Sequence, residues 1–408
     1  MLKNLKISFF LAYKSIVRGN KGTLSLTVLI MTLAFVNLIF ISSIFMGIVV
    51  SMNEGAIENE FSNIVIEPGV DENYIKQVAN MQSLIDSTPG VMGSAAHYVA
   101  GAIENFDENK DGKDIKSTSR PIKSINPENE RRVTKIHENM VAGEYLQKSD
   151  RDKIILGREI SGGYEASLEE GMSIGVDVGD EIEVIFGNGV KRDYEVKGIF
   201  STKNIGADQM IFITEKEMES VLGTHNMASE ILVKIEQTGQ EDKYIKEFRR
   251  IGITEEDIKP WTEYMGMVAS VMGSFNMISA ILGIIGAIVA GITIFIVIYV
   301  SVVNRRRQIG ILKAIGMKEK IIINSYILQA LFYAILGISL GMIIVFVLLV
   351  PYFLNNPLNF PMGWVSLAVT QNNLIISSVS LFVAALIGGF IPSWQGAKQS
   401  ILDAIWGN

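Results

Sequence analysis

The chain has 408 residues, of which 49% are hydrophobic and 19% are charged, and it contains no cysteine. Soluble proteins usually carry about a quarter charged residues, so this composition indicates a membrane protein. The lack of cysteine excludes disulfides, thiolate metal sites, thiol catalysis and a cysteine-linked lipid anchor. The net charge is −7, and no basic patch with interleaved aromatic residues is present, so we expect no nucleic-acid partner.

The charges are divided sharply along the chain. Residues 51–262 hold 40 of the 43 acidic residues, whereas residues 1–22 carry five Lys or Arg and no acid. Residues 304–320 carry six Lys or Arg against one Glu. Because basic segments stay on the cytoplasmic side of a membrane, we expect both termini in the cytoplasm of a multi-pass cell (inner) membrane protein. Residues 51–262 then lie outside.

Four apolar runs are long enough to cross a bilayer, which takes roughly 20 helical residues. The fold class that follows is an α-helical membrane protein with four transmembrane helices plus an α+β extracytoplasmic domain inserted between helices 1 and 2. In chain order we expect a basic N-terminus (1–22), transmembrane helix 1 (23–50), the extracytoplasmic domain (51–262), a stalk with transmembrane helix 2 (263–304), a cytoplasmic amphipathic helix (305–320), transmembrane helix 3 (321–350), an external loop (351–372), transmembrane helix 4 (373–391) and a cytoplasmic tail (392–408).

The first two runs are longer than a membrane requires. A helix of about 40 residues measures roughly 60 Å, twice the ~30 Å of the hydrocarbon core. We expect both helices to continue outward as a stalk that carries force; the alternative is an interrupted helix with a loop near Gly266–Gly273. None of the runs has an ionisable residue in its middle, which argues against an ion-coupled carrier, a proton pump or an intramembrane protease.

Residues 51–262 alternate between strand-like and helix-like patterns, which predicts an α+β domain. The strands are expected at 63–67, 153–157, 181–186, 192–200, 209–213 and 229–235, and the helices at 72–87, 215–222 and 240–250. Gly187-Asn188-Gly189 predicts a tight hairpin turn. The three histidines are scattered without ligand-like spacing, and no GxSxG, HExxH or P-loop motif is present. We therefore expect no enzyme activity in this chain.

One loop has metal-like spacing. Asp107, Asn109 and Asp111, followed by Gly112, match the first half of a calcium-binding loop. The twelfth position, however, is Thr118 instead of the usual bidentate Glu, and nearby lysines dilute the negative charge. We favour a solvated loop over a calcium site.

Residues 305–318 read RRRQIGILKAIGMK. Three arginines alone would suffice to stop transfer across the membrane, but they do not require the four apolar residues that follow. We assign Ile309, Ile311, Leu312 and Ile315 to one arc of an amphipathic helix. A short helix of this kind lies on the membrane or docks in a groove on a partner.

This segment resembles the "R-E-I-G-I-L-K-A-I-G" signature of FtsX-like ABC transporter permeases, the MacB/LolC/LolE group. The C-terminal segment from Ile391-Pro392 to Ala404-Ile405 is similar to the ending of that family. Ile125-Asn126-Pro127-Glu128 resembles the "G-I-D-P" of the lipoprotein-release branch, and "IILG", "GVDVGDEIE" and "VKGIF" follow in that branch's order. The resemblance covers nearly the whole chain and implies a MacB-like periplasmic core in residues 51–262.

The resemblance implies the permease subunit of a mechanotransmission-type ABC transporter. ATP and Mg²⁺ would be used by a separate cytoplasmic ATPase (MacB/LolD-like), and a second permease copy or paralogue would form a dimer. The coupling helix that contacts the ATPase would comprise Arg305, Arg306, Arg307, Gln308, Ile309, Gly310, Ile311, Leu312, Lys313, Ala314, Ile315 and Gly316. We expect Ile309, Leu312 and Ile315 to occupy the ATPase groove. Gln308 departs from the family's Glu, which removes one salt bridge to the ATPase.

The remaining partners that we expect are membrane lipid and, as a further candidate, a periplasmic or extracellular protein. The cargo implied by the family is a lipoprotein, lipid-linked molecule, peptide or hydrophobic compound that is exported or released outside the membrane. The alternative is an FtsX-like transmembrane signalling scaffold that activates a cell-wall hydrolase, although FtsX has a much smaller external domain. A tight external protein partner without cargo binding would favour that alternative.

Overall fold

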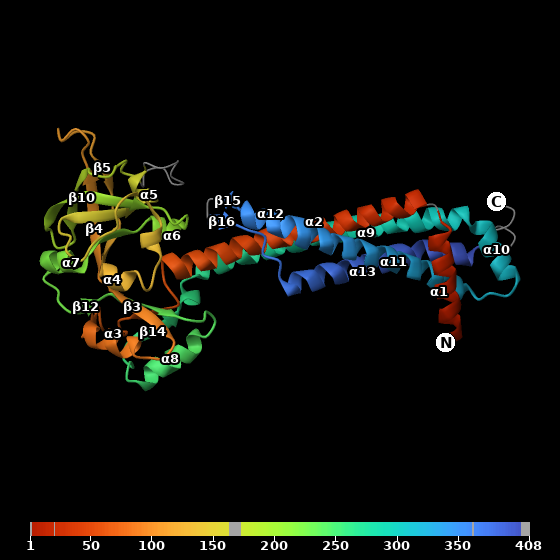
Figure 1. Cartoon of the computed structure of the whole chain (residues 1–408), viewed down its shortest axis with the longest axis horizontal. Helices are drawn as coiled ribbons and strands as arrows, with labels where there is room; N and C mark the ends of the chain where they lie inside the picture. Colours follow the sequence, from red (N-terminus) through yellow and green to blue (C-terminus); the bar gives the residue numbers. More distant parts are fainter. Residues whose placement is uncertain (1, 20, 163–172, 361–362, 401–408) are drawn as a thin grey trace. The chain divides into compact units, whose positions relative to one another are not determined.

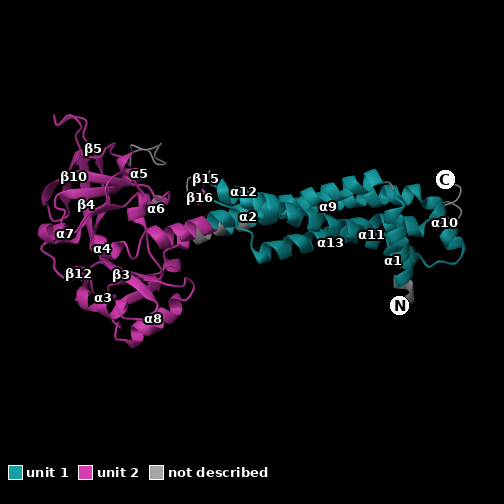
Figure 2. Ribbon diagram, in the orientation of Figure 1, with its two compact units in different colours: residues 1–49, 271–358, 365–408 teal, residues 50–270, 359–364 magenta. Residues whose placement is uncertain are grey.

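The computed structural model describes residues 2–19, 21–162, 173–360 and 363–400. The chain divides into two compact units, coloured separately in Figure 2. Unit 1 comprises residues 1–49, 271–358 and 365–408, and unit 2 comprises residues 50–270 and 359–364. The last eight residues of the expected cytoplasmic tail, 401–408, lie outside the described residues, and so do Ala404 and Ile405 of the family-like ending.

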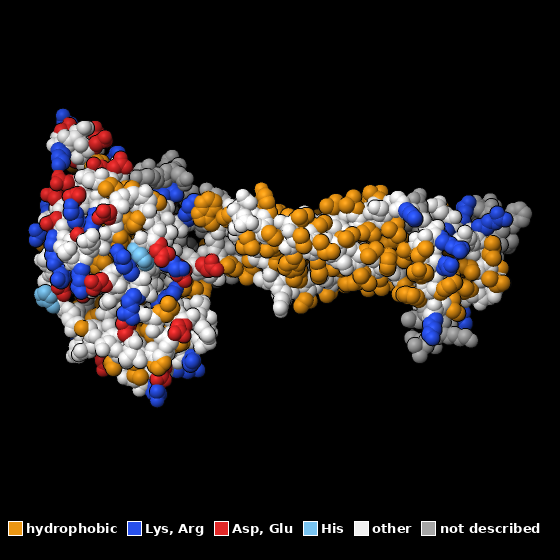
Figure 3. All heavy atoms as spheres, viewed as in Figure 1, with side chains coloured by type: hydrophobic (Ala, Val, Ile, Leu, Met, Phe, Trp, Pro, Cys, Tyr) orange, Lys and Arg blue, Asp and Glu red, His pale blue; other side chains and the backbone are white. Residues whose placement is uncertain are grey.

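Unit 1 is helical (Figure 1). Its helices are α1 (Leu2–Val17), α10 (Arg306–Ala314), α11 (Glu319–Ile344), α12 (Val350–Asn355), α13 (Gln371–Lys398) and the unit 1 parts of α2 (Lys21–Asn59) and α9 (Gly266–Asn304). Within the described residues, four helical segments are long and apolar enough to cross a membrane: Lys21–Asn59, Gly273–Asn304, Glu319–Asn355 and Gln371–Lys398. Figure 3 shows these helices as an apolar band, with Lys and Arg gathered at the end that holds α1 and α10.

The two long helices have no break in the described residues. Both α2 and α9 run for 39 residues, so α9 passes through Gly266–Gly273 as a helix and not as the loop of the alternative interpretation. The third span does change geometry: α11 passes through a π-helical turn, Val345–Leu349, into α12. Pro351 in the first turn of α12 explains the change, because proline has no N–H to donate to the preceding turn.

Glycines set the closest helix contacts in unit 1. A Cβ added to Gly337 of α11 would lie 2.6 Å from the Met31 Cβ of α2, and one added to Gly388 of α13 would lie 2.3 Å from the Gly291 carbonyl oxygen of α9. These distances are shorter than any real Cβ contact, so larger residues would force the helices apart. Small residues of this kind are the usual basis of helix association in lipid.

Unit 2 contains a ring of six strands. Its members pair in the order β4, β6, β11, β8, β10, β9 and back to β4. Their bounds are β4 (Val99–Phe106), β6 (Pro121–Ile125), β8 (Lys153–Gly157), β9 (Glu181–Phe186), β10 (Lys191–Phe200) and β11 (Ile211–Thr214), with β5 (Lys116–Thr118) and β7 (Met140–Gly143) added at the edges. Inward-facing residues such as Ile154, Val184 and Tyr194 are fully buried and form its core.

A second, antiparallel sheet has the order β14-β1-β13-β3. Its strands are β1 (Ile64–Glu67), β3 (Val91–His97), β13 (Glu230–Ile235) and β14 (Asp257–Pro260), and α3 (Val78–Asp86) and α8 (Glu241–Arg250) bury their apolar faces against it. The helix predicted from residue 72 begins only at Val78. Gln77, at φ 54°, adopts the left-handed conformation, which ends the short strand β2 (Ile75–Lys76) and separates it from α3.

The remaining elements of unit 2 are short. They are the helices α4 (Pro127–Glu130), α5 (Arg158–Ser161), α6 (Ile205–Asp208) and α7 (Glu215–Leu222), the 3-10 turns Ile136–Glu138 and Trp261–Glu263, and β12 (Met227–Ala228), which pairs with β2. A hairpin of β15 (Leu358–Phe360) and β16 (Gly363–Val365) lies in the predicted external loop. The predicted turn at Gly187-Asn188-Gly189 joins the antiparallel pair β9 and β10, with Gly189 at φ 83°.

Candidate coupling surface

The predicted amphipathic segment folds as the short helix α10. It ends in a Schellman motif: Gly316, at φ 87°, donates its N–H to the Lys313 carbonyl (2.9 Å), and Met317 donates to the Leu312 carbonyl (3.1 Å). Glycine is the residue that adopts this left-handed conformation at little cost. The sequence therefore fixes where the helix stops and where the chain turns into α11.

Two basic residues of the predicted ATPase-binding set attach α10 to its own unit. Arg305, immediately before α10, donates from both Nη atoms to Ser15 of α1, to its hydroxyl and to its carbonyl oxygen. Lys313 donates to the carbonyls of Ala397 and Gln399 at 2.7 Å each, at the end of α13, and forms an ion pair with Glu319 at 3.1 Å. These two side chains therefore position α10 on the helical unit.

The four apolar residues do not share one face, which corrects the sequence interpretation. Ile309 is only 3% exposed and packs in the helical core of unit 1, and Leu312 is half-buried beside it. Ile311 and Ile315 are 51% and 75% exposed. The physical reason is helix geometry: residues two apart lie about 200° apart around an α-helix, so Ile309 and Ile311 point in opposite directions.

The exposed face of α10 is compact and mixed in character. We define it as the coupling face; it consists of Arg307, Gln308, Ile311, Ala314 and Ile315, all of which are exposed. Ile311 and Ile315 are one helical turn apart and form its apolar centre. Arg306 and Gly316 are exposed at the start of α10 and just after its end, and Gly310 is buried. Gln308, where the family signature has Glu, belongs to this face, so a partner there meets an amide.

Within unit 2, the end of α2 is held by ion pairs and apolar contacts. The Glu58 carboxylate forms ion pairs with Lys234 (2.8 Å) and Lys135 (3.0 Å). Ala56 and Ile57 pack against Trp261 and Met265, which immediately precede α9. The end of α2 is therefore packed against the segment that precedes α9, and Glu58 also joins it to Lys234 of β13.

A buried charge cluster connects the two sheets of unit 2. His97, at the end of β3, lies between two carboxylates, with Nε2 2.7 Å from Glu130 and Nδ1 3.1 Å from Glu230. Lys123 of β6 lies 2.7 Å from the same Glu230 oxygen, and Thr134 donates to Glu130 at 2.8 Å. Because both ring nitrogens face carboxylates, this arrangement favours the doubly protonated form of His97, which donates to both.

The pKa values in this cluster follow from burial and from the paired charges. Burial alone would lower the pKa of His97, but the carboxylates of Glu130 and Glu230 reverse this and raise it to about 9. Burial would raise the pKa of Glu130, which His97 holds below its usual range. Glu60, just after α2, is partly buried near Lys123 and Glu230, and this burial raises its pKa to about 7. The sequence showed only that the histidines lack ligand-like spacing, and it gave no sign of this cluster.

In the calcium-like loop, two of the carboxylates accept hydrogen bonds from backbone N–H groups of the same loop. Asp107 accepts a hydrogen bond from the Gly112 N–H at 2.7 Å, and Asp111 accepts one from the Lys113 N–H at 2.8 Å. Asn109 lies exposed between them. In the part of the chain that the structure describes, no group of three or more His, Cys, Asp or Glu is placed to hold a metal ion. The calcium site stays a prediction, and the solvated loop remains the favoured interpretation.

The calcium hypothesis has a direct thermal test. If Asp107, Asn109 and Asp111 bind the ion, millimolar calcium should raise the melting temperature of the full chain, because a ligand that binds only the folded state stabilises it. Asp107→Ala should abolish that rise, and magnesium serves as the control cation. An equal melting temperature with and without calcium in the wild-type chain would exclude the site.

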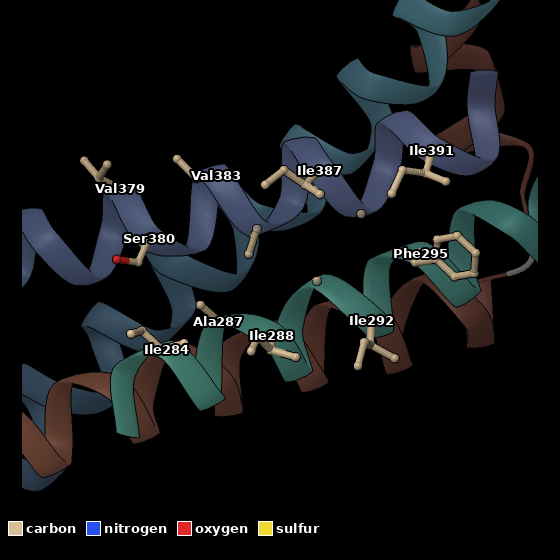
Figure 4. A pocket seen from close by; sticks show the side chains of 13 residues that line it. Ile284, Ala287, Ile288, Ile292, Phe295, Val379, Ser380, Val383, Ile387 and Ile391 are labelled. Atoms are coloured by element: carbon tan, nitrogen blue, oxygen red, sulfur yellow. The ribbon is translucent and has the colours of Figure 1, made fainter. Parts of the chain in front are cut away.

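An apolar groove lies between α9 and α13 in unit 1 (Figure 4). It has a volume of about 550 Å³, and Ser380 supplies the only polar side chain among its 13 lining residues. The helices touch at Gly291 and Gly388, and isoleucine, valine and Phe295 line the groove on either side of this crossing. A groove of this composition offers hydrocarbon contact and no acid–base or metal chemistry.

The fold and these contacts define a four-helix membrane protein with an α+β domain of the extracytoplasmic type between its first two spans. Residues 24–251 match the family model of the MacB-like periplasmic core domain, and residues 280–401 match that of the FtsX-like permease C-terminal. The first match alone covers more than half of the chain. The chain therefore belongs to the MacB/FtsX-type family of ABC transporter permeases.

Individual relatives are distant. An uncharacterized ABC transporter permease, MJ1507 of Methanocaldococcus jannaschii, is 25% identical over 246 residues, which is 57% of this chain and 58% of that protein. The macrolide export ATP-binding/permease protein MacB of Burkholderia pseudomallei is 27% identical over 140 residues, 32% of this chain and 19% of that protein. This chain thus aligns with just over half of the first relative and about a fifth of the second.

Two solved structures resemble part of the chain. The periplasmic region of MacB from Actinobacillus actinomycetemcomitans covers 53% of this chain and 97% of that structure, with 13% identity and a TM-score of 0.36. The extracellular domain of the noncanonic ABC-type transporter YknZ from Gram-positive bacteria covers 48% and 97%, respectively, with 14% identity and a TM-score of 0.33.

Proposed function

We propose that this chain is the membrane subunit of a mechanotransmission-type ABC transporter. A separate cytoplasmic ATPase would dock on the coupling face of α10, and its ATP-driven movement would reach the extracytoplasmic domain through α2 and α9. The cargo, a lipoprotein, lipid-linked molecule, peptide or hydrophobic compound, would be released or expelled outside the membrane. A second permease copy would complete the assembly.

The observation that carries this proposal is that α10 exposes apolar side chains while it is held firmly to the helices of unit 1. Ile311 and Ile315 are exposed on a helix that Arg305 and Lys313 fasten to α1 and α13. An exposed apolar pair on an immobilised helix loses little conformational entropy on binding, which is what an efficient docking surface needs. The same attachment would transmit a push on α10 to the rest of unit 1.

Two further features support the mechanical part of the proposal. Both α2 and α9 are continuous helices with residues in unit 1 and in unit 2. Among the residues that line the groove between α9 and α13, none is ionisable. A subunit that moves cargo by force outside the membrane needs long helices and no polar pathway through its spans.

The test is purification of the tagged full chain from its own host in mild detergent, with quantitative mass spectrometry of the proteins that accompany it. We expect a P-loop ATPase in stoichiometric amount, and its loss from an Ile311→Asp/Ile315→Asp variant. Absence of an ATPase in two different detergents would overturn the proposal. Recovery of a cell-wall hydrolase without any lipoprotein or peptide cargo would replace transport by the FtsX-like signalling function.

A further inference from the structure

A small polar cavity lies in unit 1 where α1, α2, α9 and α11 meet, beside the start of α10. Its volume is about 110 Å³, which exceeds the roughly 30 Å³ that one water molecule occupies in the liquid. Six of its lining side chains bear hydrogen-bonding groups in addition to Arg305. They are Ser15, Thr23, Ser301, Asn304, Gln329 and Tyr333.

Arg305 brings a positive charge to this cavity, and no carboxylate among the described residues pairs with it. Its guanidinium has five N–H donors, and the hydrogen bonds that it makes in the structure go to Ser15. Within the described residues, Arg305 forms no ion pair with an Asp or Glu. Residues 1–50 and 264–408 contain two acids. Glu319 pairs with Lys313, and Asp403 lies outside the described residues.

The hydrogen bonds among the other polar groups leave the Tyr333 proton available to an anion. Ser15 donates to Gln329 at 3.1 Å, and Gln329 donates to the Tyr333 hydroxyl at 2.6 Å. The Tyr333 hydroxyl accepts that bond and keeps its own proton for donation. Thr23 and Leu24, in the first turn of α2, also line the cavity, and the free N–H groups of a helix's first turn favour negative charge. Arg305, the cationic side chain among the described lining residues, together with the Tyr333 hydroxyl and the start of α2, matches a phosphate group.

The neighbouring helix α1 indicates where the phosphate comes from. It crosses the ends of the spanning helices instead of running along them (Figure 1). Phe9, Phe10, Tyr13 and Val17 are exposed on it, Lys14 lies 5.9 Å from the Phe10 ring, and Ser8 and Ala12 are buried on the opposite side. Exposed aromatic rings mixed with lysines are typical of a helix lying at the lipid headgroup level.

We propose that this cavity binds the phosphate of an anionic phospholipid headgroup. Arg305 would hold the phosphate, a geometry that guanidinium groups favour, and the exposed aromatic row of α1 would contact the adjoining acyl region. Basic pockets between spanning helices are suited to such headgroups. Because Arg305 immediately precedes α10, a bound lipid would also fix the start of the coupling helix; this consequence rests on the proposed function, whereas the binding site does not.

The experiment measures lipid retention by the purified full chain. The chain in a neutral detergent is titrated with phosphatidylglycerol, phosphatidylcholine or inorganic phosphate, and bound ligand is counted by native mass spectrometry. We expect phosphatidylglycerol to bind at least about tenfold more tightly than phosphatidylcholine. Arg305→Gln should weaken it about tenfold or more, the typical loss for one charge-assisted hydrogen bond. The exposed neighbour Arg306, changed to Gln, serves as the matched control.

A second variant protects the test against misfolding of the first. Ser301→Leu narrows the cavity and leaves the bonds between Arg305 and Ser15 intact, so it should also reduce retention. If the Arg305→Gln and Ser301→Leu variants retain as much phosphatidylglycerol as the Arg306→Gln control, the proposed site is wrong. If inorganic phosphate at the same concentration displaces the phosphatidylglycerol, the cavity is a site for free phosphate, and the assignment to a lipid headgroup is wrong. Neither result depends on an ATPase, so failure here leaves the proposed function untouched.

Discussion

Replacing Ile311 and Ile315 together by aspartate is expected to abolish stimulation of the partner ATPase while the chain still folds and inserts. Each exposed isoleucine that becomes buried in a partner groove contributes roughly 1–3 kcal/mol to docking. Loss of both, with two carboxylates left to desolvate, therefore weakens docking by at least about a hundredfold. The measurement is ATP hydrolysis by the co-purified ATPase, reconstituted with the wild-type or the variant chain.

Two controls separate docking from folding. Ile115→Asp changes a similarly exposed isoleucine (49% exposed) in unit 2 and should leave the stimulation unchanged. Ile309→Ala removes a buried side chain of α10, so it should lower the stability of unit 1 by about 2–5 kcal/mol through the cavity it leaves. Full stimulation by the Ile311→Asp/Ile315→Asp variant would show that another surface meets the ATPase.

The membrane part of the fold could be predicted because its physical causes are local in the sequence. Hydrophobic length alone indicates a spanning helix, and the four segments found in the structure correspond to the four apolar runs. The π-helical turn at Val345–Leu349 and the extension of α13 through Pro392 to Lys398 were not predicted. Both depend on how a proline is accommodated by neighbouring helices, which local hydrophobicity does not encode.

Prediction was weaker for the coupling face. The sequence shows that α10 is amphipathic, but it does not show how the helix is rotated against its own unit. That rotation is set by Lys313, which reaches carbonyls 84 and 86 residues further along the chain. It is also set by the packing of Ile309 against the helical core. Contacts over such distances in sequence leave no periodic signal near α10.

The α+β fold was recognised from alternating strands, and the closure of six strands into a ring was not. Ring closure depends on the pairing of β9 with β4, two strands that are about 80 residues apart. The charge cluster was missed for the same reason: His97, Lys123, Glu130 and Glu230 come from four elements, and no spacing relates them. Only the fold brings them together.

Glu130→Gln is expected to have the largest effect on the stability of unit 2. The Glu130 side chain is 1% exposed and 2.7 Å from His97, so the substitution leaves a buried imidazolium with one carboxylate fewer. Breaking a buried ion pair in this way typically costs about 3–5 kcal/mol. Amide hydrogen exchange of β3 and β13 in the full chain measures this local loss directly, because protection reports the free energy of opening.

The matched control lies on the same short helix. Glu128 is also in α4, but its side chain is 70% exposed and pairs with Lys148 at 3.2 Å. An exposed pair contributes about 0–1 kcal/mol, so Glu128→Gln should leave the protection of β3 and β13 nearly unchanged. If the two glutamine variants exchange at the same rate, the cluster has no part in joining the sheets.

The cluster also predicts how this protection varies with pH. The pKa of His97 is raised from 6.5 to about 9, so its contribution is fully present below pH 6.5 and is lost as the pH rises through 9. The pKa of Glu130 is lowered from 4.5, so its contribution is present above pH 4.5 and is lost at lower pH. Glu60, with a pKa raised from 4.5 to about 7, contributes below pH 4.5 and loses that contribution as the pH rises through 7.

These three contributions together make the opening free energy of β3 highest near pH 4.5. Glu60 lowers it from there to about pH 7 and His97 lowers it further towards pH 9, by on the order of 1.4 kcal/mol for each unit of pKa shift. Exchange rates corrected for the intrinsic effect of pH should show that decline in the wild-type chain. His97→Gln should remove the part of the decline above pH 7, because the other two groups have by then completed their titration. A decline that persists unchanged in His97→Gln would mean that this imidazolium is not the group that holds the two sheets together.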